Sequence, residues 1–209
     1  MTDKAMTLPT PVGDGRVRLV PGARRSGAQP GLLCLGHGAG GGVGAPDLVA
    51  VTSAATAAGW TVALIEQPYR VAGRRAPAPA AQLDVAWTTI VAALRPDVAG
   101  LLVTGGRSSG ARVACRTAAA CAADGVVCLA FPLHPPARPE RSRADELRAV
   151  EVPVLVVQGE RDPFGGPAEL CSIDAAGATV AAVPGDHSLR ASAAEVGSIV
   201  AGWLARFSG

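Results

Sequence analysis

One serine lies in a setting that could make it a nucleophile. Ser108 stands within residues 106–110, Gly-Arg-Ser-Ser-Gly, between a predicted strand over 100–104 and a predicted helix over 109–123. A serine on such a tight strand-to-helix turn is pushed out at the top of the sheet, and small neighbours let the two backbones approach closely. The first amides of the helix then face any negative charge that develops there.

A nucleophilic serine needs a base, and the base needs a group that orients it. His187 follows the predicted strand 179–184, and Asp162 follows the predicted strand 152–159. The order Ser108, Asp162, His187 is the one that accompanies a nucleophile on a strand-to-helix turn. Taken singly, His187 can be an ordinary loop histidine, and Asp162-Pro163 can simply start a turn. The three together predict nucleophilic attack on an acyl group.

A glycine-rich loop supplies the remaining part of such a site. Residues 36–42 read Gly-His-Gly-Ala-Gly-Gly-Gly and follow the predicted strand 32–36. Bare backbone is needed where a substrate oxygen must come close to an amide, since side chains would fill the space. We therefore expect the backbone amides of Ala39 and Ser109 to form an oxyanion hole.

Three further polar residues are candidates for binding a substrate. His37 belongs to the glycine-rich loop, Arg70 opens an arginine-rich loop, and His134 follows the predicted strand 126–131. An arginine in such a place can bind a carboxylate or a phosphate. A solvated arginine loop, and a loop histidine beside two prolines, are the respective alternatives.

The same glycine-rich loop has a second interpretation. Residues 36–41 match the G-x-G-x-x-G pattern of dinucleotide-binding proteins, and Glu66 ends the next predicted strand near the spacing of a ribose-binding acid. Such a site needs its helix to begin within the glycines. Here Gly42, Gly44 and Pro46 delay the helix. A dinucleotide site would also leave the order of Ser108, Asp162 and His187 unexplained.

The elements that must position these residues alternate along the chain. Apolar runs predict strands at 32–36, 61–66, 100–104, 126–131, 152–159 and 179–184, and alanine-rich stretches predict helices at 46–58, 81–94, 109–123, 167–175 and 189–207. This alternation predicts a parallel sheet with right-handed crossovers. Residues 6–9 and 16–20 are expected to form a hairpin. Ligands bind at the carboxyl ends of such strands, where the candidate residues stand.

Composition excludes several classes of function. The chain has 209 residues, 49% hydrophobic and 17% charged, which fits a single domain over residues 1–209. A net charge of +2 without a block of basic residues does not indicate a nucleic-acid-binding surface. No apolar run reaches the roughly 20 residues of a membrane span. Five cysteines without CxxC spacing argue against a disulfide scaffold and a structural zinc site. With no apolar leader over residues 1–12, the expected compartment is the cytoplasm.

Several segments together resemble the α/β-hydrolases. The resemblance covers about residues 31–190 and rests on the loop at 37–41, Glu-Gln-Pro-Tyr-Arg at 66–70, the serine turn at 106–112, Phe-Pro-Leu-His-Pro-Pro at 131–136, Gln-Gly-Glu-Arg-Asp-Pro-Phe at 158–164 and Gly-Asp-His-Ser at 185–188. Within that superfamily, the chain is similar to a small group that includes relatives of testis-expressed protein 30 and NSL-complex subunit 3. This group is near the dienelactone-hydrolase-like proteins.

The resemblance implies both a fold and an activity. It implies an α/β/α sandwich with a mostly parallel sheet of about eight strands, and a catalytic triad of Ser108 as nucleophile, His187 as base and Asp162 as orienting acid. Dienelactone hydrolases proper carry cysteine at the nucleophile position, so their substrate does not transfer to a chain with Ser108. Some members of the group serve as subunits of complexes, so a catalytically idle binding module is the alternative function.

The substrate is expected to be small. About twenty residues separate the predicted strands 126–131 and 152–159, which is too few for a cap domain. We therefore expect an open site that takes a small-molecule acyl substrate, a carboxylic ester or a thioester, without a cofactor or a metal ion.

Overall fold

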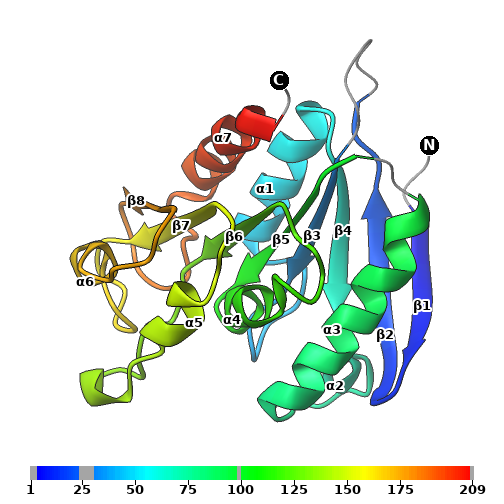
Figure 1. Cartoon of the computed structure of the whole chain (residues 1–209), viewed down its shortest axis with the longest axis horizontal. Coiled ribbons are helices and arrows are strands. Elements are labelled where there is room, and N and C mark those ends of the chain that lie inside the picture. Colours follow the sequence, from blue (N-terminus) through cyan, green and yellow to red (C-terminus); the bar gives the residue numbers. More distant parts are fainter. Residues whose placement is uncertain (1–3, 24–30, 98–99, 208–209) are drawn as a thin grey trace.

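The computed structural model describes residues 4–23, 31–97 and 100–207, and one eight-stranded sheet runs through them (Figure 1). The strand order is β1-β2-β4-β3-β5-β6-β7-β8. The strands are β1 (Lys4–Thr10), β2 (Gly13–Val20), β3 (Leu32–Gly36), β4 (Thr61–Glu66), β5 (Leu102–Arg107), β6 (Gly125–Leu129), β7 (Val154–Gly159) and β8 (Ala178–Val183). The β1–β2 and β2–β4 pairs are antiparallel, and every other pair is parallel. The carboxyl ends of β3 to β8 therefore lie along one edge.

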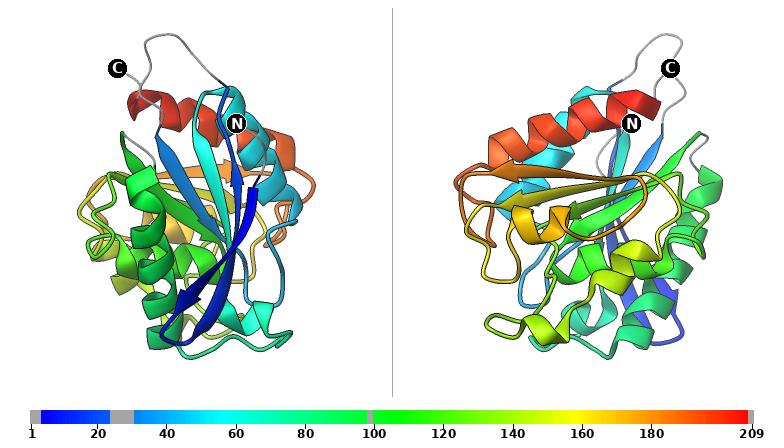
Figure 2. Two further views of the ribbon diagram at one scale, coloured as in Figure 1. Left: turned by 90° about the vertical axis from the view of Figure 1, so that its right-hand side faces the viewer. Right: turned by 60° about the vertical axis from the view of Figure 1, so that its left-hand side comes forward.

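Helices cover both faces of this sheet. They are α1 (Pro46–Ala57), α2 (Pro68–Val71), α3 (Ala80–Leu94), α4 (Ser109–Thr117), α5 (Ala144–Arg148), α6 (Pro167–Cys171) and α7 (Ala193–Leu204), with short 3₁₀ turns η1 (Arg95–Asp97), η2 (Pro139–Arg141) and η3 (Ala205–Phe207). Figure 2 shows α1 and α7 on one side of the sheet and α3 and α4 on the other. None of the described helices is long and apolar enough to cross a membrane.

The alternation of side chains along the central strand explains the two helical layers. Leu33 and Leu35 of β3 pack into the core beneath α1 and α7, whereas Leu32 and Cys34 pack into the core beneath α3. All four side chains are fully buried. Because successive residues of a strand point to opposite faces, a continuous apolar run requires cover on both sides.

The predicted fold class is confirmed. The sheet is mostly parallel and lies between helices, and only η2 and α5 intervene between β6 and β7, so no large cap is present in the described part of the chain. The strands at 32–36 and 61–66 have the predicted bounds. The hairpin is longer than predicted, since it pairs all of β1 with β2.

Three predicted helices are shorter by several residues in the structure, and one of them, expected over 167–175, ends at Cys171. The helix expected over 109–123 ends at Thr117, and Ala122 beyond it has a φ of 49°. The helix expected over 189–207 begins at Ala193, because Leu189 has a φ of 51° and lies in the preceding loop. Left-handed backbone interrupts a helix wherever it occurs, and neither alanine nor leucine is a residue type that signals it.

The turn at Ser108 depends on a close contact between α4 and β3. A Cβ atom at Gly110 would lie 2.6 Å from the carbonyl oxygen of Gly36. Only glycine fits there without movement of the backbone, so the two segments approach as closely as their main chains allow.

We predict that Gly110→Ala destabilises the protein by about 1–3 kcal/mol or more, because the added methyl group must displace backbone rather than a flexible side chain. Chemical denaturation measures the loss. Gly44→Ala is the matched control, since nothing lies within 4 Å of a Cβ at that position. Equal stability of the two variants would contradict the proposed close contact.

Candidate active site

Ser108 occupies a strained turn at the end of β5. It lies between the last residue of β5 and the first of α4, with φ 53° and ψ −110°. Non-glycine residues held in such sparsely populated backbone regions cost about 1–3 kcal/mol and cluster at functional sites. The Ser108 amide donates a 2.9 Å hydrogen bond to the carbonyl oxygen of Leu129 on β6, which holds the turn in place. The sequence pattern predicted this turn.

His187 joins Ser108 to Asp162. Its Nε2 lies 2.9 Å from the Ser108 Oγ, and its Nδ1 lies 2.8 Å from the Asp162 Oδ2. An Nδ1 proton shared with a carboxylate leaves Nε2 free to accept a proton from the serine. The structure therefore brings together the three residues that the sequence analysis singled out, from the ends of β5, β7 and β8.

Asp162 is held by donors from β7 and from its own loop. Its side chain is fully buried, a position that a carboxylate tolerates only with hydrogen-bond partners. Gln158 Nε2 donates to Oδ2 at 2.9 Å, and the Phe164 amide donates to Oδ1 at 2.9 Å. Gln158 Nε2 also reaches the carbonyl oxygens of Phe131 and Gly165, so one side chain connects the loops after β6 and β7.

The two predicted oxyanion donors have free amides. Ser109 is the first residue of α4, so its N–H has no partner within the helix. The Ala39 N–H donates to no protein acceptor among the described residues. The Ala39 carbonyl oxygen accepts a 2.7 Å hydrogen bond from the Tyr69 hydroxyl, which holds the glycine-rich loop against α2.

His37 supports the glycine-rich loop from inside. Its Nδ1 lies 2.8 Å from the Gly38 carbonyl oxygen, and its Nε2 accepts a 3.1 Å hydrogen bond from the Gln67 amide. The ring is buried, and this burial lowers the pKa of His37, so the imidazole is neutral. Both ring nitrogens are occupied, which leaves His37 no free polar atom for the substrate-binding role expected from the sequence.

The other two candidate substrate residues also lie outside the Ser108 cluster. Arg70 on α2 donates through Nη1 to the Arg74 carbonyl oxygen at 3.2 Å, and no bond among the described residues links it to Ser108 or His187. The ring nitrogens of His134 lie 2.9 Å from the Pro135 carbonyl oxygen and 3.0 Å from Glu169 on α6.

His134 reaches the site only through its backbone. Its amide donates a 3.0 Å hydrogen bond to the carbonyl oxygen of Phe164, and the Phe164 ring lies against the His187 ring with centroids 4.3 Å apart. The side-chain pair of His134 and Glu169 therefore stabilises the loop that carries Phe164 and Asp162.

Sequence reasoning missed three residues that shape the site, namely Arg107, Gln158 and Phe164. Arg107 was visible inside the serine turn, but only as a neighbour of Ser108. Gln158 is a fully buried glutamine at the end of an apolar strand, and such a residue needs a polar partner. A glutamine at the end of an apolar strand could therefore have indicated that Gln158 bonds to another polar group.

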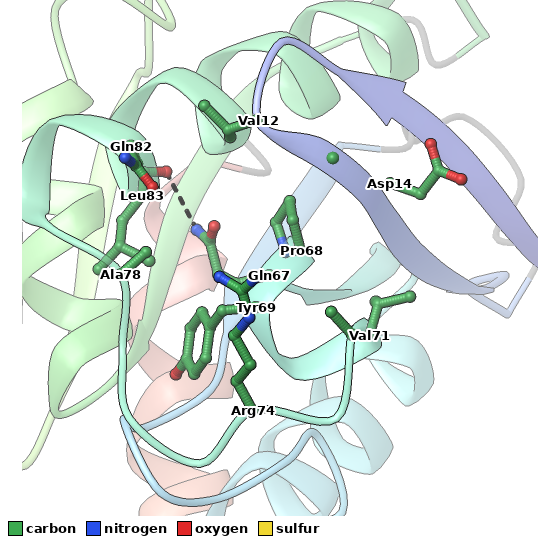
Figure 3. A pocket seen from close by; sticks show the side chains of 12 residues that line it. Val12, Asp14, Gln67, Pro68, Tyr69, Val71, Arg74, Ala78, Gln82 and Leu83 are labelled. Atoms are coloured by element: carbon green, nitrogen blue, oxygen red, sulfur yellow. Dashed lines mark hydrogen bonds between the residues drawn. The ribbon is translucent and has the colours of Figure 1, made fainter.

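Two hollows flank the site. One of about 400 Å³ is lined by the glycine-rich loop, Arg107, Ser188 and Arg190, and therefore borders the immediate chain neighbours of Ser108 and His187. The other, of about 390 Å³, lies between the β1–β2 turn, α2 and the start of α3, and no Ser108, Asp162 or His187 atom lines it (Figure 3). Neither hollow is lined by Ser108, Asp162 or His187, and the first lies nearer to them through Arg107 and Ser188.

The glycine-rich loop does not have the geometry of a dinucleotide site. The following helix α1 begins only at Pro46, well beyond Gly41. Its first amides therefore lie outside the glycine pattern, where they cannot meet a pyrophosphate held by that pattern.

Comparison with known proteins agrees with this geometry. Residues 29–199 match the alpha/beta hydrolase domain family. The chain belongs to the alpha/beta hydrolases. A search of curated proteins gives no match.

Solved structures share the alpha/beta hydrolase fold of this chain. XC6422 from Xanthomonas campestris, described as an a/b serine hydrolase without lid, has a TM-score of 0.83 at 20% identity, with 100% of this chain and 96% of that chain covered. Est1E from Butyrivibrio proteoclasticus has a TM-score of 0.81 at 16% identity over 97% and 98% of the two chains. Dienelactone hydrolase from Anabaena variabilis has a TM-score of 0.75 at 18% identity over 100% and 99%. At these identities the likeness concerns the fold alone.

The pair of His134 and Glu169 makes the stability of this hydrolase depend on pH. The Pro135 carbonyl oxygen, together with Glu169, raises the pKa of His134 above its ordinary 6.5. The Gly166 amide, together with His134, lowers the pKa of Glu169 below its ordinary 4.5. The histidine contribution is complete below pH 6.5 and is lost as pH rises, and the glutamate contribution is complete above pH 4.5 and is lost as pH falls.

We therefore predict that His134→Gln lowers the melting temperature most near pH 5.5, between these two ordinary values, and less near pH 8.5. The loss stays within about 1 kcal/mol, because solvent screens a pair whose Glu169 side chain is 51% exposed. Thermal unfolding of both proteins at the two pH values measures it. A difference that grows toward alkaline pH would refute the account, and Arg148→Gln, which removes an exposed ion pair elsewhere, is the control.

Proposed function

We propose that this protein is a serine hydrolase that cleaves a small or exposed carboxylic ester or thioester through an acyl-enzyme intermediate. The observation that carries the proposal is the strained Ser108, whose Oγ lies 2.9 Å from the Nε2 of His187. The contact of that imidazole with the buried Asp162 supports it further.

The first half of the reaction acylates the serine. Ser108 Oγ attacks the acyl carbon while His187 Nε2 takes the hydroxyl proton, and Asp162 stabilises the imidazolium that results. The amides of Ala39 and Ser109 donate to the oxyanion of the tetrahedral intermediate. When the intermediate collapses, the bond to the leaving oxygen or sulfur breaks, and His187 returns its proton to that atom.

The second half releases the acid. Water attacks the acyl carbon of the acyl-enzyme as His187 Nε2 takes a proton from the water, and the bond to Ser108 Oγ breaks as His187 returns that proton to the serine. The products are a carboxylic acid and the alcohol or thiol. No cofactor or metal ion takes part in this proposal.

The open approach supports small substrates. No large cap lies over the site in the described residues, and the hollow beside Arg107 and Ser188 holds about 400 Å³. Aromatic residues form only 3% of the chain, which disfavours stacking against a large aromatic substrate. The chemistry of Ser108, His187 and Asp162 alone does not separate esters from thioesters.

Two narrower expectations belong to the same proposal. Kinship with relatives of testis-expressed protein 30 and NSL-complex subunit 3 stays a prediction, and so does the cytoplasm as the compartment. A catalytically idle binding module has no evident need for Ser108, His187 and Asp162 in mutual contact, so we favour the enzyme.

The first experiment is labelling of the purified protein with a fluorophosphonate, which needs an activated serine and an open oxyanion hole but not the right substrate. We expect the wild type to be labelled and Ser108→Ala to remain unlabelled. Ser109→Ala is the matched control, because it removes the neighbouring hydroxyl and keeps the amide. A folded wild type that takes no label would overturn the proposal in favour of a binding module.

A second test asks whether Ser108 and His187 act as a unit. Ser108→Ala and His187→Ala should each remove nearly all turnover of a short ester, and the double variant should lose little more. The reason is that neither group accelerates the attack without the other. Steady-state kinetics of the three variants gives the comparison, and additive losses would contradict the shared role.

A further inference from the structure

One guanidinium group contacts three of the segments that build the site. Arg107, which directly precedes Ser108, donates through Nη2 to the carbonyl oxygen of His187 at 2.8 Å. Its Nε lies 3.0 Å from the Oδ2 of Asp47 in the first turn of α1. Its Nη1 packs against the glycine-rich loop, since a Cβ atom at Gly38 would lie 3.0 Å from it.

Asp47 fixes the direction of this guanidinium. The Asp47 side chain is fully buried, whereas 18% of the Arg107 side chain is exposed. Burial raises the pKa of Asp47, and the charge of Arg107 opposes that rise. Because Leu48 and Val51 of α1 are also fully buried, the carboxylate cannot move with the loop. A buried charge needs its partner, so the ion pair holds Arg107 in one orientation.

Because the guanidinium group of arginine is planar, orienting one of its nitrogens also orients the nitrogen that hydrogen-bonds to His187. Charge attraction holds Nε 3.0 Å from Asp47 Oδ2, without hydrogen-bond geometry, and Nη2 in the same plane donates to the carbonyl oxygen of His187. A lysine would offer one ammonium at the end of a flexible stem, which can pair with Asp47 or reach His187 but does not hold both.

We propose that Arg107 is a positioning residue that holds the backbone of His187 at a fixed distance from Ser108, anchored by Asp47. The inference rests on the proposed function, in which His187 is the base. Arg107 itself touches no reacting atom. It connects the segment of the nucleophile to the segment of the base through a path that is independent of the hydrogen bond between Ser108 and His187.

The kinetic test compares Arg107→Lys with wild type on a neutral short ester. We expect kcat to fall about ten- to hundredfold, the usual net value of a hydrogen bond from a charged donor, while KM stays within about twofold. Because lysine keeps the positive charge, the pH–rate profile should keep its shape while the rate falls at every pH. Asp47→Asn should also lower kcat, since it releases the anchor of Arg107.

Arg112→Lys is the matched control. Arg112 lies on α4, shortly after Ser108, and pairs with Glu146 through two hydrogen bonds, and within the described ranges no hydrogen bond or ion pair joins it to His187. The Arg112→Lys variant should lower the free energy of unfolding without lowering kcat. An equal fall of kcat in Arg107→Lys and Arg112→Lys would contradict the positioning role of Arg107, because a general loss of structure would then explain both losses.

Hydrogen exchange tests the inference without relying on activity. The amides of Ser188 and Leu189 donate to Asp186, so their protection reports the order of the loop that carries His187. We expect their exchange to become at least tenfold faster in Arg107→Lys and to stay unchanged in Arg112→Lys. Unchanged exchange in Arg107→Lys would overturn the inference even if the wild type turned over no ester.

The outcomes separate the two proposals. If the wild type takes no fluorophosphonate label and yet the loop loosens in Arg107→Lys, the positioning contact stands and the proposed hydrolase activity fails. If the wild type is active and Arg107→Lys keeps full kcat, the hydrolase stands and the positioning role of Arg107 fails.

Discussion

The close contact between α4 and β3 is the constraint on which the site depends. Gly110 and Gly36 meet backbone to backbone, and this proximity allows the chain to leave β5 and enter α4 through the single strained residue Ser108. The strain costs about 1–3 kcal/mol, which the packed core on both faces must offset. Because the turn is so short, the neighbours of Ser108 are held as firmly as Ser108 itself. Arg107 and Ser109 are therefore held in fixed positions beside Ser108.

Hydrogen bonds between loops hold the residues of this open site in place. Buried or partly buried polar groups join several loops at the carboxyl edge of the sheet to one another. Gln158 connects the segments after β6 and β7, Tyr69 holds the loop after β3, and Arg107 reaches the segment after β8. A buried hydrogen bond in low dielectric is stiff and costly to break, so such contacts can replace the support of a cap.

Much of this could be predicted from the sequence because the signals were local. The strands after which Ser108, Asp162 and His187 stand are continuous apolar runs, and a parallel sheet brings their carboxyl ends to one edge. The helix bounds were less predictable. Left-handed backbone at Ala122 and Leu189 falls on residue types that do not signal it, and it reflects the path that the chain must take into β6 and α7.

The parts that escaped prediction are pairs of residues far apart in the chain, each with an ordinary local explanation. Asp47 looks like an acid in the first turn of a helix, and Glu169 looks the same at the start of α6. Only burial separates them, since the side chain of Asp47 is inaccessible and that of Glu169 is half exposed. A fully buried carboxylate requires hydrogen-bond donors or a cation, whereas an exposed one gains little from its partner. The cation that meets the need of Asp47 is Arg107, whose backbone is already fixed by the turn at Ser108. One ion pair therefore satisfies a buried charge and aligns the segment of His187, so the stability of this fold and the geometry of its site depend on the same contact.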